Sequence, residues 1–184
     1  PPRRALGLAC VPEDRNGHAA VPDFSLADNT VLTARHRLPL APLGVIARGD
    51  VARFATAVIQ RFDVRTTGPA ALARSLSGGN LQKFIMGREI GQTPSVLVVC
   101  QPTWGVDAGA AAAIRQELVD LAAKGSAVVV ISQDLDELLE LADRLCVINE
   151  GRLSPARDVA RLRIDEIGLM MGGVHGSQVE PAYG

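Results

Sequence analysis

The stretches Val96-Leu-Val-Val-Cys100 and Ala127-Val-Val-Val-Ile131 decide the fold of this 184-residue chain. Both are rich in β-branched residues and show no alternation of polar and apolar positions. This pattern is typical of strands buried on both faces of a parallel sheet. Gly7–Val11 and Leu145–Ile148 are weaker examples of it. All these stretches are far shorter than the roughly 20 residues that cross a bilayer, so we expect sheet strands and no membrane-spanning segment.

Helical patterns lie between these strands. Asp107 is placed to cap a helix over Ala108–Ala123, which Gly125 would end. A second helix is expected over Asp134–Ala142, because acidic side chains in its first turn suit the helix dipole. Strands and helices that alternate in this order predict an α/β fold with a mainly parallel sheet and crossover helices.

The middle of the chain, Pro12–Gln92, has helical patterns and no strong strand pattern. Asp50 is placed to cap a helix in which Val51, Ala55 and Val58 follow helical spacing. We therefore expect an α-helical subdomain inserted in the α/β core. The glycine-rich tail Gly172–Gly184 is expected to be loose.

Composition and charge limit the classes of protein to which this chain can belong. The chain has 19 basic and 20 acidic residues, a net charge of −1, and 47% hydrophobic residues. This balance excludes a disordered or collagen-like chain and argues against a nucleic-acid binder that depends on excess positive charge. The cysteines Cys10, Cys100 and Cys146 are widely spaced and form no CxxC pair, so neither a disulfide framework nor a zinc knuckle is predicted. A reducing, cytosolic compartment fits this usage.

The sharpest local motif is Leu76-Ser-Gly-Gly-Asn-Leu-Gln82, which precedes a helical pattern. A serine hydroxyl and glycine amides at a helix N-terminus can bind an anion, since the unpaired N–H groups and the helix dipole both favour phosphate. Taken alone, the motif favours the simpler interpretation, a serine-capped helix start that has glycines in its turn.

Further motifs follow in a regular order, and together they resemble the ATP-binding subunit of an ABC transporter. Leu76–Gln82 matches the signature motif of that family, Val96–Gln101 its Walker B strand, Gly105–Asp107 its D-loop and Ser132–Asp134 its switch-histidine motif. Upstream, Glu13 stands at the glutamine position of the Q-loop. The match covers nearly the whole chain.

The finer pattern is similar to the second, C-terminal ATPase copy of fused importers for simple sugars and nucleosides. The stretches that carry this likeness are Val11–Arg15, Arg74–Asn80 and Ile167–Gly172. Gln101–Thr103 leans toward the nucleoside type.

The resemblance implies where nucleotide would bind. In ABC ATPases two domains stack head to tail, and each ATP lies between the P-loop of one domain and the signature motif of the other. ATP and Mg²⁺ are the implied cofactors of the full-length dimer. The residues implied in ATP binding are Ser77, Gly78, Gly79, Asn80, Glu13 and Asp107.

One departure from the family pattern is the P-loop. Its Gly-x-x-x-x-Gly-Lys-Ser/Thr motif is not in the sequence, whose lysines are Lys83 and Lys124. We therefore expect residues 1–184 to be the C-terminal portion of one ABC ATPase domain, a partial P-loop-NTPase-type core without the Walker A half. The expected parts are a helical subdomain at 14–92, core sheet and helices at 1–13 and 93–155, and a C-terminal helix and tail at 156–184.

The other departure is chemical. Cys100 stands where the family has the aspartate that holds Mg²⁺, and a neutral thiol is a poor ligand for that hard cation. Gln101 stands where the general-base glutamate is found, and its amide cannot take a proton. Gln133 replaces the switch histidine and cannot titrate near neutral pH. The resemblance thus implies an intact signature motif beside degenerate hydrolytic positions, and no metal bound by Cys100.

Together these observations predict part of the ATP-binding subunit of a sugar or nucleoside importer, inactive as an ATPase by itself. The implied partners are another ATPase copy, membrane permease subunits and, indirectly, a solute-binding protein, with no nucleic acid. The implied location is cytoplasmic, peripheral on the inner face of the cell membrane. Two alternatives stay open: the C-terminal head lobe of a chromosome-maintenance or DNA-repair ATPase, and a non-enzymatic regulatory ABC-like domain.

Overall fold

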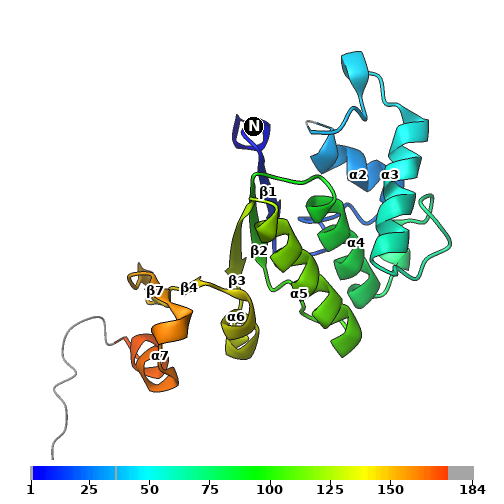
Figure 1. Ribbon diagram of the computed structural model, residues 1–184. Helices are drawn as coiled ribbons and strands as arrows, with labels where there is room; N and C mark the ends of the chain where they lie inside the picture. The colour runs from blue at the N-terminus through cyan, green and yellow to red at the C-terminus, as the bar shows by residue number, and fades with distance from the viewer. Residues whose placement is uncertain (1, 36, 174–184) are drawn as a thin grey trace, which may run out of the picture. The chain divides into compact units, whose positions relative to one another are not determined.

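A computed structural model of the chain describes residues 2–35 and 37–173 (Figure 1). The α-helices are α1 (Pro2–Ala5), α2 (Leu26–Ala34), α3 (Arg48–Arg61), α4 (Gly78–Ile90), α5 (Ala108–Ala123), α6 (Leu135–Leu141) and α7 (Ile164–Met171). The strands are β1 (Leu8–Val11), β2 (Val96–Cys100), β3 (Ala127–Ile131), β4 (Arg144–Leu145), β5 (Ile148–Asn149), β6 (Arg152–Leu153) and β7 (Arg157–Asp158). Two compact units, 1–133 and 134–184, make up the chain.

The first unit contains a parallel sheet in the order β1-β2-β3. Its register pairs Leu8 with Val96 and Val96 with Ala127. In Figure 1 the three strands run side by side, and contacts join α4 to β1 and α5 to β3. The α/β fold with a parallel sheet and crossover helices is therefore confirmed.

One face of this sheet is fully buried along β1 and β2, and half-buried along β3. Ala9, Val11, Leu97 and Val99 are at most 2% exposed, whereas Val129 and Ile131 on the opposite face are about half exposed. The prediction that both apolar stretches are buried on two faces is therefore wrong: β2 is only half-buried on its second face, and β3 is exposed there. Its β-branched composition suits a strand that is covered on both sides, but α4 and α5 supply cover on one side only.

The regular elements in the described part of 12–92 are helices, with isolated bridges and no named strand, as the sequence pattern predicted. The expected role of Asp50 is wrong: α3 starts at Arg48 after Ala47, and Asp50 lies inside the first turn, paired with Arg53. The helix begins three residues earlier than expected, and Asp50 is still favourable there because an acid suits the first turn of a helix.

Helix α4 is the centre of the first unit and is buried along most of its length. Arg88, 1% exposed, donates from Nε to Glu89 Oε1 at 2.7 Å and from Nη2 to the carbonyl of Ala19 at 2.8 Å. Its Nη1 also donates to the carbonyl of Asn29 at 3.2 Å. These bonds join the C-terminal end of α4 to α2 and to the segment that follows β1. The helix is therefore anchored at the end opposite to the Ser77 turn.

The predicted helix after β2 is confirmed in detail. Helix α5 spans Ala108–Ala123, and the Asp107 side chain accepts a hydrogen bond from the amide of Ala110 at 2.9 Å. Ile114, Leu118 and Leu121 are buried on its inner face. Gly125, at φ +96°, follows the helix end as expected.

The second unit departs from one prediction. Leu145–Ile148 is not one strand: β4 pairs antiparallel with β7, and β5 pairs antiparallel with β6. The apolar side chains of Leu145 and Val147 instead pack with Ile167 and Met170 in a separate small core. The helix expected over Asp134–Ala142 is present as α6, but Asp134 is its N-cap and not a member of its first turn, and Ala142 is its C-cap. The expectation of a loose tail falls mostly on 174–184, outside the described residues.

Within the described ranges no helix is long and apolar enough to span a membrane. The proposed division into 14–92, 1–13 with 93–155, and 156–184 stays a prediction.

Candidate functional site

The candidate site is built around the turn that starts α4. Ser77 has an extended backbone, and its Oγ accepts hydrogen bonds from the Asn80 amide at 3.4 Å and from Asn80 Nδ2 at 2.9 Å. The serine cap predicted from the sequence is therefore confirmed. Ser77 and Gly78 are exposed and Gly79 is half-buried, so this turn lies at the protein surface.

Asn80 has a local role in this turn. Its Nδ2 donates to Ser77, and its Oδ1 accepts from the backbone amide of Arg65 at 2.9 Å. Both polar atoms of the amide are therefore used within the protein. The side chain fixes the Ser77 hydroxyl and joins the turn to the loop that follows α3.

The turn packs against the loop Gln101–Asp107, which connects β2 to α5. A Cβ atom added to Gly79 would lie 2.9 Å from the carbonyl oxygen of Gly105. Arg15 contacts both parts: its guanidinium donates to the Trp104 carbonyl and lies beside Gly78. The structure thus brings together the signature-like turn, the D-loop-like segment and the segment after β1.

The end of β2 places Gln101 in an unusual conformation. Its φ is +50°, a region that residues other than glycine seldom adopt. Its backbone amide donates to the carbonyl of Ile131 at 2.8 Å, and its side-chain Oε1 accepts from Ser132 Oγ at 3.3 Å. Gln101 therefore lies next to the segment that carries Gln133, whose own side chain is exposed.

Asp107 ends this loop as the cap of α5. The hydrogen bond from Ala110, with a smaller contribution from Lys83, lowers the pKa of the Asp107 carboxyl from its ordinary value of 3.8. Asp107 is therefore ionised at neutral pH. It is exposed, and its carboxylate already serves the helix start.

Cys100 lies on the less buried face of the sheet, near Cys10 and Glu13. Burial raises the pKa of the Cys100 thiol, and Cys10 and Glu13 raise it further. The thiol is therefore protonated at neutral pH. Among the described residues no group of three or more His, Cys, Asp or Glu side chains could hold a metal ion. This donor set does not fit Mg²⁺, whose preferred ligands are carboxylate, phosphate and water oxygens.

Two residues with clear roles here were not singled out from the sequence. Gln82, 2% exposed, donates from Nε2 to the carbonyls of Gln101 at 3.2 Å and Pro102 at 2.8 Å. Arg15 is the second. A polar residue on the buried face of an otherwise apolar helix is a signal that could have indicated Gln82.

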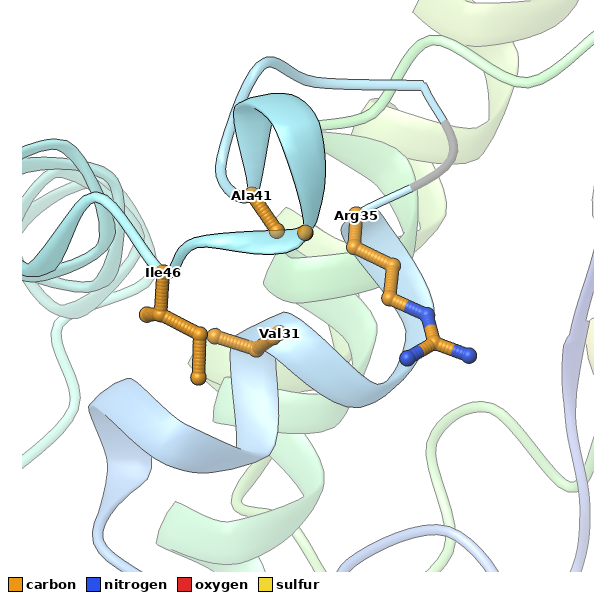
Figure 2. A pocket seen from close by; sticks show the side chains of 5 residues that line it. Val31, Arg35, Ala41 and Ile46 are labelled. Carbon is orange, nitrogen blue, oxygen red and sulfur yellow. The ribbon is translucent and has the colours of Figure 1, made fainter.

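A pocket of about 350 Å³ lies in the helical part, away from these residues. It is lined by Val31, Arg35, Ala41, Gly44 and Ile46. Figure 2 shows the side chains of Val31 and Ile46 pointing toward one another. None of the predicted site residues lines this pocket.

Known proteins are similar to this chain over most of its length. No family model matches it. The chain is 38% identical over 167 residues to the guanosine import ATP-binding protein NupO of Bacillus subtilis, covering 91% of this chain and 33% of that protein. It is 40% identical over 154 residues to the ribose import ATP-binding protein RbsA of a Chelativorans species, covering 83% of this chain and 30% of that protein. The chain thus spans about one third of the length of these relatives.

Solved structures share the fold. A dimeric ATP-binding cassette in a post-hydrolysis state, bound to ADP and Pi, matches with a TM-score of 0.71 at 19% identity, covering 85% of this chain and 65% of that one. The ATP-binding subunit of an ABC transporter matches with the same TM-score at 15% identity, covering 91% and 69%. The fold is therefore that of an ATP-binding cassette.

Proposed function

This chain belongs to the ABC ATPase family, and we propose that it contributes a phosphate-binding turn to an ATP site whose P-loop lies on another ATPase copy. The work of the whole protein would be ATP-driven import of a simple sugar or a nucleoside. The names of the matched relatives support the importer assignment.

The observation that carries the proposal is the turn Ser77–Asn80. Ser77 caps a helix of 13 residues, Gly78 and Gly79 form its first positions, and Ser77 and Gly78 face solvent. Free amides at such a helix start, with a hydroxyl beside them, suit the terminal phosphate of a nucleotide. Asn80 would act here by orienting the Ser77 hydroxyl.

The second part of the proposal is that this chain's own hydrolytic positions do not function. Cys100 is a protonated thiol, and the Gln101 amide cannot take a proton from water. Gln133 is an exposed amide that cannot titrate near neutral pH. A nucleotide at that site would be held and not hydrolysed.

The proposed partners follow from the same family. They are another ATPase copy, permease subunits contacted through the segment after Glu13, and indirectly a solute-binding protein. The proposed location is the inner face of the cell membrane. Glu13 is exposed, as a contact residue must be before assembly.

Calorimetric titration of Mg-ATP tests this function. We expect no binding to the isolated chain at micromolar concentration. Binding and turnover should appear when the chain is mixed with the ATPase copy that carries the P-loop. Tight binding by the isolated chain would contradict the proposal, because a complete nucleotide site would then lie within it.

A further inference from the structure

The loop Gln101–Asp107 is held mainly by side chains from outside its own strand and helix. Gln82 on α4 donates to two consecutive carbonyls, those of Gln101 at 3.2 Å and Pro102 at 2.8 Å. At 2% exposure this amide is buried, so the bonds are not exchanged with water.

The loop needs such support because its backbone is strained at Gln101, which has φ +50°. Gly105, at φ +68°, adopts this region without strain because it has no Cβ atom. A residue other than glycine stays in this region only when its surroundings fix it there. The two bonds from Gln82 fix the backbone directly at and after Gln101.

Arg15 holds the same loop from the opposite end. Its guanidinium donates to the Trp104 carbonyl, next to the point where Gly105 touches Gly79. Arg15 follows β1, whereas Gln82 belongs to α4. Three carbonyls of one short loop are thus bound by two side chains from different segments.

We propose that Gln82 and Arg15 are positioning residues that make the loop 101–107 and the turn 76–80 move as one body. A displacement at the end of β2, beside Gln101, then reaches Ser77 and Gly79 without loss. This inference rests on the proposed function, since the turn would act on a nucleotide held by the partner copy. Both end residues of the loop, Gln101 and Asp107, are predicted site residues.

Trp104, the single tryptophan of the chain, reports on the loop directly. It is 68% exposed, it lies two residues after Pro102, and its own carbonyl accepts the hydrogen bond from Arg15. Acrylamide quenching of its fluorescence in the 184-residue chain measures how freely the loop moves. This readout needs neither nucleotide nor partner.

The central variant is Gln82→Met, which keeps the length of the side chain and removes its donors. We expect its quenching constant to rise about twofold, with unchanged far-UV circular dichroism. Arg15→Met should act in the same direction, and Arg15→Lys, which keeps a donor, should restore most of the protection. Val58→Ala, a buried change in α3, is the control for lost stability alone. If Gln82→Met matches wild type or this control in quenching, the proposal is wrong.

Turnover of the assembled ATPase pair gives the second test. Gln82→Met should lower kcat about tenfold while the KM for ATP stays within about twofold, because positioning and not affinity is lost. A change in KM alone would overturn the coupling step. If the wild-type pair itself shows no turnover, the proposed function fails. The Trp104 measurement still decides whether Gln82 and Arg15 restrain the loop 101–107.

Discussion

The backbone of Gly79 lies so close to Gly105 that a Cβ atom on Gly79 would be 2.9 Å from the Gly105 carbonyl oxygen. The obstacle is backbone and not the end of a flexible side chain, so it cannot swing away. This contact joins the helix start that carries Ser77 to the loop that leads to Asp107. Glycine at position 79 is therefore required by packing as well as by any role in phosphate binding.

Gly79→Ala should destabilise the first unit by about 1–2 kcal/mol, because the added methyl group overfills this contact. Gly49→Ala in α3 is the matched control, since its added methyl group would meet only Arg53 at an ordinary 3.6 Å. Urea unfolding followed by circular dichroism checks both. Equal stability of the two variants would show that the Gly79–Gly105 contact is not tight in solution.

The capping carboxylate of Asp107 should make stability depend on pH. The Ala110 amide lowers its folded-state pKa below the ordinary 3.8, so its ionised form stabilises the fold above that value. This stabilisation is lost as pH falls through the folded pKa. Asp107→Asn keeps a good cap that does not titrate.

Melting temperatures of wild type and Asp107→Asn, compared from about pH 7 to about pH 2.5, test this dependence. We expect a constant difference at neutral and mildly acidic pH. Below the ordinary value of 3.8 the wild type should lose stability relative to the variant. A difference that stays constant over the whole range would contradict the capping role of the charge.

The start of α4 and the cap of α5 were predictable from sequence because both depend on local chemistry. Ser77 and Asp107 each bond an amide three residues ahead, so spacing alone identifies them. The cap of α3 was predicted wrongly at Asp50, since an acid is favourable both as a cap and within the first turn. Local signals fix the type of an element better than its first residue.

Contacts between distant segments were not predictable in this way. The bonds from Gln82 to Gln101 and from Arg15 to Trp104 join residues 19 and 89 positions apart. A single sequence contains no spacing rule for such pairs. The exposed face of β3 was missed because composition tells which residues favour burial and not what covers them.

The buried Arg88–Glu89 pair should dominate the stability of the helical part. Arg88→Met removes three hydrogen bonds and leaves the Glu89 carboxylate buried, which should cost about 3–5 kcal/mol. Arg74→Met, which breaks an exposed pair with Asp23, should stay within about 1 kcal/mol of wild type. Urea unfolding measures both, and a cost for Arg88→Met no larger than for Arg74→Met would refute the buried network.

The two faces of the sheet should respond differently to the same substitution. Val99 is fully buried on β2, so Val99→Thr should cost about 1–3 kcal/mol by burying a hydroxyl without a fixed partner. Val129 on β3 is 49% exposed, so Val129→Thr should change stability by less than about 0.5 kcal/mol. Comparable losses would mean that the second face is covered in the protein in solution.

The most direct test of the central claim is the turnover of the assembled pair with Ser77→Asp against Ser77→Asn. Both residues cap a helix as well as serine does, so the fold is kept. Only aspartate places a negative charge where the terminal phosphate would bind. We predict that Ser77→Asp lowers turnover about a hundredfold or more, whereas Ser77→Asn stays within about tenfold of wild type. Wild-type turnover by the Ser77→Asp pair would contradict the claim that this turn binds the nucleotide of its partner.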